Sequence, residues 1–269
     1  MTERLSAAFT ATGRKHRAIL CPFVTAGYPS IDLLGPILES LQHAGAGCIE
    51  LGIPFSDPIA DGPTIQESYR LALEQGATVQ RIFQAVAQIR SRGFTLPIMA
   101  MASFSIIFKH GADDFASACA NAGIDGLILP DVPLEEAPAV VEELTRAELR
   151  ASLLVAPTTP SARRDEIVRW CNGFVYYLSV SGITGERAAL PTGLEEKIAD
   201  IKKVTPRPIC VGFGISSPAH VQALVGKADG VIVGSALVRR MTAAVQAGTD
   251  PAEAAGRFVA ELAVGLTSA

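Results

Sequence analysis

Two acidic residues stand where an apolar run near the front of the chain gives way to a loop. Glu50 lies in the run Cys48-Ile49-Glu50-Leu51, and Asp61 closes the following loop directly before Gly62-Pro63. The run is typical of a buried strand, where an ionised carboxylate is costly unless it is paired or has a chemical task. A strand acid and a loop acid that face one cavity are typical of general acid/base chemistry.

Each of these carboxylates also has a structural interpretation. Glu50 would then form a buried salt bridge with a distant Arg, and Asp61 would cap a helix that opens at Pro63. Asp57, in the same loop, would be a turn residue that accepts a backbone N–H. The run around Glu50 contains no basic residue, so there the sequence favours the catalytic interpretation.

Two glycine-containing segments later in the chain are candidates for binding an anion. Gly212-Phe213-Gly214 follows one apolar run and Gly234-Ser235 follows the next. Glycine allows the backbone to approach a ligand, and free N–H groups at a helix N-terminus bind phosphate. The alternative is that Ser217 and Ser235 only cap helices. A third segment, Ser179 to Pro191, is long and rich in small residues, which favours a lid over the substrate rather than a simple surface loop.

Short apolar runs alternate with helix-periodic stretches along the whole chain, which predicts an α/β fold with parallel strands. The expected strands are Ala18 to Val24, Gly47 to Leu51, Pro97 to Met101, Gly126 to Leu129, Ala151 to Val155, Phe174 to Leu178, Pro208 to Val211 and Gly230 to Val233. The expected helices are Ile31 to His43, Val79 to Arg90, Ala112 to Ala122, Leu134 to Glu148, Leu194 to Val204, Ser217 to Val225, Ala236 to Ala247 and Pro251 to Leu266.

Eight such units favour a closed (β/α)₈ TIM barrel over an open sheet, with an extra N-terminal helix covering the bottom. The length of 269 residues, 49% of them hydrophobic, is sufficient for a single domain over residues 1–269. The strand-end acids and the glycine-containing segments would then share the face at the carboxyl ends of the strands, where barrel active sites lie.

Composition excludes several classes of partner. The net charge is −4 and the basic residues are scattered, so we expect no nucleic-acid or membrane binding. The five cysteines lack CxxC spacing and read as buried, reduced thiols of a cytoplasmic protein. No metal site is expected, because the histidines are isolated, and we interpret His43 and His220 as surface histidines.

Several motifs together resemble one family, the tryptophan synthase α subunit. They are Phe23-Val24-Thr25-Ala26-Gly27, Glu50 to Pro63, Asp131-Val132-Pro133, Gly182-Ile183-Thr184-Gly185, Gly212-Phe213-Gly214-Ile215-Ser216 and Gly234-Ser235-Ala236. The resemblance implies a (β/α)₈ barrel that cleaves indole-3-glycerol phosphate to indole and glyceraldehyde 3-phosphate by a retro-aldol reaction. It also implies a β subunit partner in an α₂β₂ heterotetramer, with pyridoxal phosphate in the β partner and no cofactor in this chain.

The same resemblance implies roles for individual residues. Glu50 matches the general acid/base, and Asp61 matches the carboxylate that stabilises positive charge on the indole ring. Substrate-binding positions are matched by Phe23, Tyr176, Thr184, Gly185, Phe213, Gly214, Gly234 and Ser235. For Phe23, Tyr176 and Phe213, ordinary packing in the barrel is the competing interpretation.

One segment departs from the family pattern. Many members carry Tyr and Asn after the third strand, where this chain reads Met101-Ala102-Ser103-Phe104-Ser105-Ile106. In the family this region borders the indole pocket and the surface that meets the β subunit. Three alternatives therefore stay open: a stand-alone indole-3-glycerol-phosphate lyase, a catalytically weak barrel that acts as a regulatory partner, and another phosphate-handling barrel enzyme.

Overall fold

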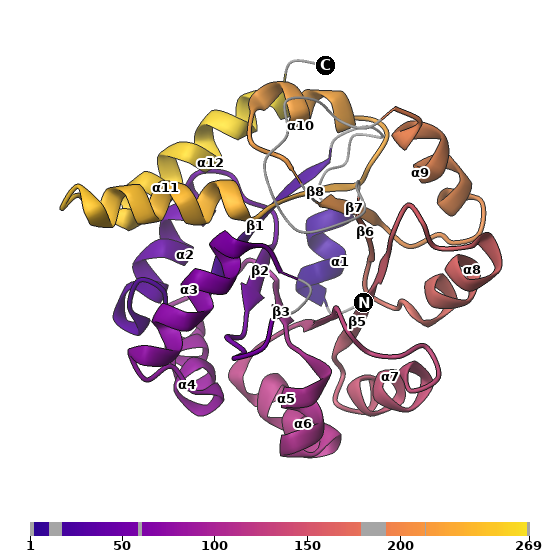
Figure 1. Cartoon of the computed structure of the whole chain (residues 1–269), viewed down its shortest axis with the longest axis horizontal. Helices are drawn as coiled ribbons and strands as arrows, with labels where there is room; N and C mark the ends of the chain where they lie inside the picture. Colours follow the sequence, from indigo (N-terminus) through magenta and orange to yellow (C-terminus); the bar gives the residue numbers. More distant parts are fainter. Residues whose placement is uncertain (1–2, 11–17, 59–60, 179–191, 213, 268–269) are drawn as a thin grey trace.

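The strands of this chain close into a parallel barrel (Figure 1). The computed structural model describes residues 3–10, 18–58, 61–178, 192–212 and 214–267. Within these ranges each strand pairs with the next one along the chain, and β8 closes the barrel on β1. The strands are β1 (Ile19–Thr25), β2 (Ile49–Gly52), β3 (Ile98–Met101), β4 (Gly126–Leu129), β5 (Arg150–Val155), β6 (Val175–Leu178), β7 (Ile209–Gly212) and β8 (Gly230–Val233).

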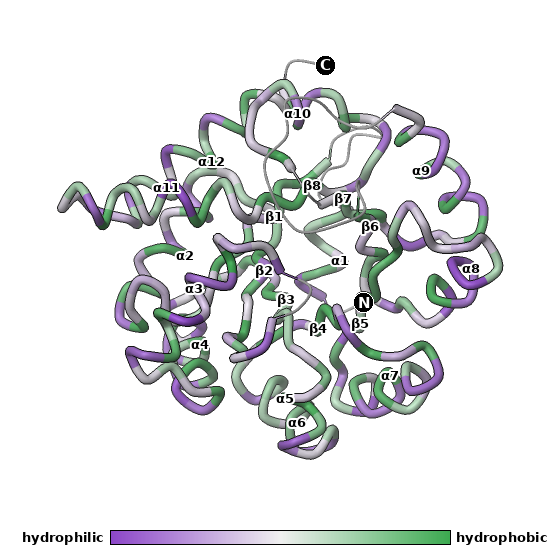
Figure 2. The backbone as a smooth tube through the Cα atoms, viewed as in Figure 1, coloured by the Kyte–Doolittle hydropathy of each residue, from purple (hydrophilic) through white to green (hydrophobic). Residues whose placement is uncertain are grey.

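Helices surround the barrel and cover the outer face of its strands. They are α2 (Leu34–His43), α3 (Pro63–Glu74), α4 (Val79–Ser91), α5 (Phe104–His110), α6 (Ala112–Ala122), α7 (Ala137–Arg146), α8 (Ser161–Trp170), α9 (Leu194–Lys202), α10 (Pro218–Leu224), α11 (Ser235–Gln246) and α12 (Pro251–Thr267), with a 3₁₀ turn η1 (Ile31–Leu33) before α2. Hydrophobic residues concentrate in the strands and on the inward helix faces in Figure 2. The strands are therefore buried from both sides, as parallel strands usually are.

The helix ends follow local chemistry. Thr78 caps α4, because its hydroxyl accepts a hydrogen bond of 3.3 Å from the Arg81 N–H. Pro63 occupies the first turn of α3, where a missing N–H costs nothing. Glu148 adopts a positive φ of 60° just after α7, which ends that helix at Arg146.

Helix α1 (Glu3–Thr10) lies against the amino-terminal ends of the strands, at the bottom of the barrel. Nε of Arg4 lies 3.0 Å from the carboxylate of Asp125, which precedes β4 and is fully buried. The same carboxylate accepts hydrogen bonds from Arg90 at 2.9 Å and from the Ile98 N–H at 3.0 Å. The expected N-terminal helix under the barrel is confirmed, and it leaves the opposite face free for a site.

The barrel and all the expected strands are confirmed, with boundaries that differ by at most two residues. The helices required more correction. Ile31 to His43 divides into η1 and α2, and Leu134 to Glu148 shortens to α7, whose start is set by a Pro in its first turn. Helices α5 and α8 were not predicted. Helix α5 is short and follows an apolar run without a break, while α8 buries only Val168 and so lacks an apolar stripe.

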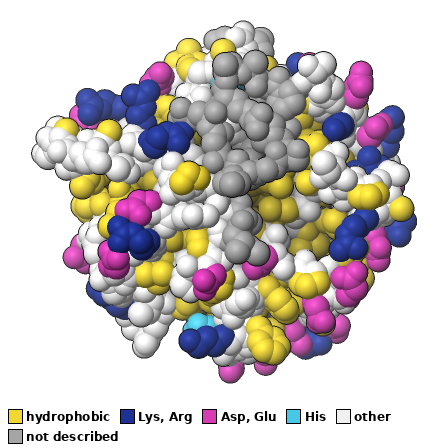
Figure 3. Space-filling view, in the orientation of Figure 1, with side chains coloured by type: hydrophobic (Ala, Val, Ile, Leu, Met, Phe, Trp, Pro, Cys, Tyr) yellow, Lys and Arg dark blue, Asp and Glu magenta, His cyan; other side chains and the backbone are white. Residues whose placement is uncertain are grey.

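The cysteine prediction is confirmed, since all five thiols are buried and none is in a disulfide. The interpretation of His220 is wrong: it is only 8% exposed, while His43 is exposed. Nδ1 of His220 accepts a hydrogen bond of 3.3 Å from the Ser216 N–H, so the ring supports the segment after β7. Lys and Arg side chains intermingle with Asp and Glu around the periphery of the face in Figure 3. No helix among the described residues has the length and apolar character needed to span a bilayer.

Candidate active site

Glu50 lies within β2 and is 2% exposed. In the described part of the chain it forms no ion pair, and Oε2 of its carboxyl has no hydrogen-bond partner. The buried salt bridge considered from the sequence is therefore not formed there. Burial raises the pKa of Glu50 to about 8, with a smaller contribution from the negative charge of Asp61. The side chain is thus mainly a neutral carboxylic acid at pH 7 and can donate a proton.

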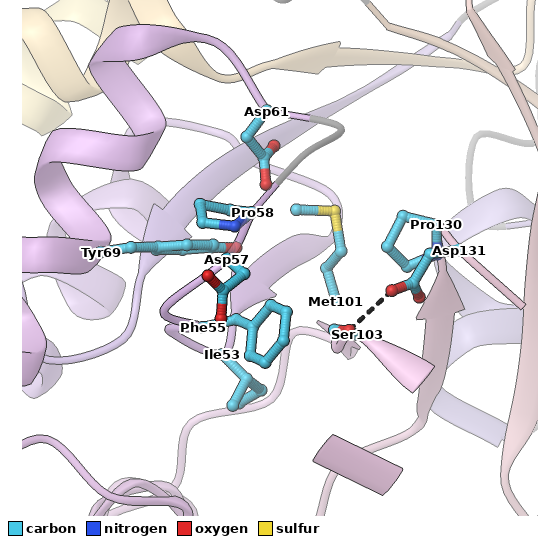
Figure 4. Close-up of a pocket in the computed structure, with 10 residues that line it drawn as sticks. All are labelled: Ile53, Phe55, Asp57, Pro58, Asp61, Tyr69, Met101, Ser103, Pro130 and Asp131. Carbon is cyan, nitrogen blue, oxygen red and sulfur yellow. Dashed lines mark hydrogen bonds between the residues drawn. The ribbon is translucent and has the colours of Figure 1, made fainter. Parts of the chain in front are cut away.

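Asp61 lies in the loop between β2 and α3, and its side chain points into a pocket (Figure 4). It does not cap α3, because Gly62 is the N-cap residue and, among the described residues, no side-chain hydrogen bond caps that helix. The loop is held by Gln66, whose Nε2 donates to the Asp61 carbonyl oxygen at 2.8 Å. Burial and then the charge of Asp131 raise the pKa of Asp61 to about 6. Asp61 is therefore mainly ionised at pH 7, so the two carboxyl groups hold different protonation states.

The pocket combines an apolar wall with an acidic edge. Its lining residues are Ile53, Phe55, Asp57, Pro58, Asp61, Tyr69, Met101, Ser103, Pro130 and Asp131. They come from the loops after β2, β3 and β4 and from α3, at the carboxyl ends of the strands (Figure 4). The Asp57 carboxylate accepts a hydrogen bond of 2.7 Å from Ser56 Oγ, and the residues that would complete its turn, 59–60, lie outside the described ranges. Such a pocket suits a mainly apolar ligand with a few polar groups.

Glu50 does not line this pocket. Gly52, two residues later in β2, lies between the barrel interior that holds Glu50 and the pocket. A Cβ atom at Gly52 would lie 2.5 Å from the Phe23 ring and 2.6 Å from the Tyr69 hydroxyl. Only glycine leaves room for both rings beyond Glu50. The ring centroids of Phe23 and Tyr69 are 6.4 Å apart, so the two side chains join the barrel interior to the pocket.

Phe23 and Tyr176 both lie in the barrel interior with Glu50. Phe23 is the Cα partner of Glu50 in the β1–β2 pairing, and Tyr176 in β6 packs over Gly212. Burial raises the pKa of Tyr176, and the charges of Glu50 and Asp61 raise it further. Tyr176 therefore carries a protonated hydroxyl close to both carboxyl groups. Both aromatic residues are buried, so the packing interpretation holds alongside the binding one.

Gly214, Gly234 and Ser235 follow the neighbouring strands β7 and β8. Gly214 has a φ of +82°, a conformation that favours glycine. Gly234 is the N-cap residue of α11 and no side chain in the described ranges caps this helix, so the first-turn N–H groups stay available for an anion. A Cβ at Gly234 would lie 3.7 Å from Cβ of Phe23, which places this helix end beside the barrel interior.

Three predicted residues, Thr184, Gly185 and Phe213, lie outside the described residues, as does the expected lid from Ser179 to Pro191. Two residues with a place in the site were missed. Tyr69 fits the sequence pattern of the apolar residues on the buried face of α3, and the motif Asp131-Val132-Pro133 predicts no role for Asp131. A polar hydroxyl on an otherwise apolar helix face was the available signal for Tyr69. Among the described residues, no cluster of His, Cys, Asp and Glu is arranged to hold a metal ion.

Comparison with known proteins extends over nearly the whole chain. A sequence model of the family "Tryptophan synthase alpha chain" matches residues 9–265. The tryptophan synthase alpha chain of a Picosynechococcus species is 41% identical over 238 residues, which cover 88% of this chain and 90% of the relative. The crystal structure of tryptophan synthase subunit alpha from Legionella pneumophila is similar with a TM-score of 0.90 and 32% identity, over 100% of both chains. A structure of Mycobacterium tuberculosis tryptophan synthase gives a TM-score of 0.88 at 32% identity and 99% coverage of both chains.

Proposed function

Because the chain belongs to the tryptophan synthase alpha chain family, we propose that Glu50 and Asp61 carry out that family's reaction in it. The chain is a lyase of tryptophan biosynthesis that cleaves indole-3-glycerol phosphate to indole and glyceraldehyde 3-phosphate. The stand-alone lyase, the inactive regulatory barrel and another phosphate-handling barrel are not favoured by this family assignment.

The separation of the two pKa values is the observation that carries the proposed roles. Glu50, with a pKa of about 8, is protonated at neutral pH and donates its proton to C3 of the indole ring. Positive charge then develops at the ring nitrogen, where Asp61, with a pKa of about 6, supplies a carboxylate. The environments thus assign one carboxyl group to proton transfer and the other to charge stabilisation.

The remaining step returns the proton to the enzyme. Once Glu50 has protonated C3, its carboxylate accepts the proton of the glycerol hydroxyl next to the bond that breaks. The hydroxyl oxygen becomes the aldehyde oxygen, and the electrons of the broken carbon–carbon bond enter the indole ring. Indole and glyceraldehyde 3-phosphate leave, and Glu50 is protonated again, so no outside acid or base is consumed.

Substrate orientation follows from the two ends of the site. We place the indole in the pocket edged by Asp61 and the phosphate at Gly214, Gly234 and Ser235, with Phe23 and Tyr176 between them. Thr184, Gly185 and Phe213 are proposed to complete the site. The uncapped first turn of α11 supports the phosphate position.

The partner and location are further proposals. We propose that the chain acts with a β subunit in an α₂β₂ assembly and that pyridoxal phosphate belongs to that partner, because the two carboxyl groups supply the proton transfers needed here. A cytoplasmic location is supported by the five cysteines, which are not in disulfides. We also propose that residues 1–269 form one domain.

Amide substitutions test the two carboxyl groups. Glu50→Gln is expected to lower the rate of indole release by roughly 10²-fold or more, because it keeps the shape of the side chain and removes its titratable proton.

Asp61→Asn is expected to lower the rate of indole release by roughly 10²-fold through lost charge stabilisation. Turnover of indole-3-glycerol phosphate is measured with and without a β subunit, and Glu67→Gln, an exposed carboxylate on α3, is the matched control. Near-normal turnover in either site variant would contradict its role.

A further inference from the structure

The end of β4 is tied to the start of α5 at the edge of the pocket. The carboxylate of Asp131 accepts a hydrogen bond of 2.6 Å from Ser103 Oγ (Figure 4). It accepts another of 2.7 Å from the Phe104 N–H. Ser103 Oγ also accepts from the Ser105 N–H at 3.3 Å, so it caps α5 while it donates to Asp131. One carboxylate from a different strand thus holds the first turn of this helix.

The same carboxylate lines one pocket together with Asp61. Both side chains line the pocket, Asp61 from the loop after β2 and Asp131 from the loop after β4. We propose that Asp131 is a positioning residue of the active site, which fixes α5 against the pocket and holds a negative charge at the pocket edge that it shares with Asp61. This inference rests on the proposed function only for the effect on catalysis.

The neighbouring titratable groups leave Asp131 as the main charge that acts on Asp61. The groups around Asp61 are Glu50 from β2, Asp57 from the same loop, Tyr69 from α3, Tyr176 from β6 and Arg239 from α11, which donates to Thr64. The other charged residues of α3, Glu67, Arg70 and Glu74, are exposed and pair with one another. Glu50 and both tyrosines have raised pKa values and are neutral between pH 5 and 7, where Asp61 titrates. Asp57 is exposed, so solvent screens its charge. Nη1 of Arg239 donates a hydrogen bond of 3.1 Å to Oγ1 of Thr64 in α3.

The hydrogen bonds from Ser103 and from the Phe104 N–H fix the position of the Asp131 carboxylate. Bonds to an ionised carboxylate are short and strong, and they fix Asp131 in one orientation. A fixed negative charge beside Asp61 disfavours its ionisation, in agreement with the raised pKa of that carboxyl. Any movement of α5 would move Ser103 and Phe104. The orientation of the Asp131 carboxylate, which both of them bind, would then change.

Two variants separate the charge from the tether. Asp131→Asn removes the charge but keeps one acceptor oxygen, so the acid midpoint of kcat is expected to fall by about half a pH unit or more. Ser103→Ala keeps the charge and removes one hydrogen bond, so the midpoint should not fall. Both should increase amide hydrogen exchange in α5, because both loosen its first turn. Asp113→Asn, an exposed carboxylate in the first turn of α6, should change neither quantity.

A measurement independent of turnover separates the role of Asp131 from the proposed function. The Asp61 carboxyl is titrated by ¹³C NMR in the full-length protein, in the original chain and in each variant. A lower Asp61 midpoint in Asp131→Asn supports the inference even if Asp61→Asn proves active, an outcome that would reject only the proposed function. An unchanged midpoint, with or without faster exchange in α5, would overturn it, since Asp131 would then give structural support alone.

Discussion

At the residue scale, two carboxyl groups of similar intrinsic acidity are set apart by their surroundings. Glu50 lies in the barrel interior and Asp61 at a pocket edge, and burial is the main cause of the raised pKa in both. Because Glu50 has the higher pKa, it is the protonated group at neutral pH. The residue types and their positions around a strand end led to the roles proposed for both groups, whereas the order of the two pKa values required the structure.

The raised pKa of Glu50 makes a prediction about stability. The folded chain binds this proton up to about pH 8, while an ordinary Glu releases it near the reference pKa of 4.5. The folded state is therefore favoured below pH 4.5, and this contribution is lost as the pH rises towards 8. Glu50→Gln removes the titration, so its stability relative to the original chain should improve between pH 5 and 9 by on the order of 3 kcal/mol.

Urea unfolding at pH 5 and pH 9 checks this gain, with Glu67→Gln as the exposed control. An equal difference between Glu50→Gln and the original chain at both pH values would show that Glu50 is not held neutral by the fold. Loss of activity combined with a gain in stability is typical of a residue kept for function.

Tyr69 and Asp131 show the limit of prediction for single residues. Tyr69 occupies a buried position of α3 that fits a core residue, and only the closeness of its hydroxyl to Gly52 reveals its place beside the pocket. Asp131 acts through partners 28 and 27 positions away in the chain. Contacts across such separations depend on strand order and loop geometry, which a local sequence pattern does not contain.

At the element scale, several candidate site residues lie at the junction between a strand and a helix. Gly52 ends β2, and Gly234 separates β8 from α11. The strands were predicted well because continuous apolar runs bounded by turn residues are a strong signal. Helices α5 and α8 were missed because one continues an apolar run and the other buries only one residue.

The start of α11 makes the prediction at this scale. Gly234→Asp would place a carboxylate beside the uncapped first turn of α11 and so repel the phosphate of the substrate. The KM for indole-3-glycerol phosphate should rise roughly tenfold or more, equivalent to about 1.4 kcal/mol. Gly234→Ala is the matched control, because a Cβ there meets only ordinary contacts with Phe23 at 3.7 and 4.0 Å. Equal KM values for the two variants would argue against an anion at this helix end.

At the scale of the whole molecule, the ion pairs that support the fold and the candidate site lie at opposite ends of the barrel. Buried Asp125 pairs with exposed Arg4 and with Arg90 at the bottom, whereas Glu50, Asp61 and the phosphate-binding candidates lie toward the opposite end. This division could be predicted from the sequence, because the active sites of such barrels lie at the carboxyl ends of the strands. The closure of β8 on β1 was expected from the count of strands and is confirmed.

The outer surface near the pocket carries one large exposed aromatic side chain. Phe108 in α5 is 77% exposed, more than any other large hydrophobic residue in the described ranges, and its ring lies 6.1 Å from that of Phe104. Helix α5 is in turn held by Asp131 at the pocket edge. In the proposed assembly, a β subunit that covers Phe108 would therefore contact the helix that borders the pocket.

Phe108→Ser should weaken activation by the β subunit without affecting the isolated chain. Burial of an aromatic anchor at an interface is worth on the order of 1–2 kcal/mol, so the β-subunit concentration for half-maximal activation should rise roughly tenfold. Val245→Ser, which changes an exposed residue of α11, serves as the control, and urea unfolding confirms that both variants keep their stability. If both variants respond to the β subunit alike, the partner docks on another face, and α5 borders the pocket without linking it to the interface.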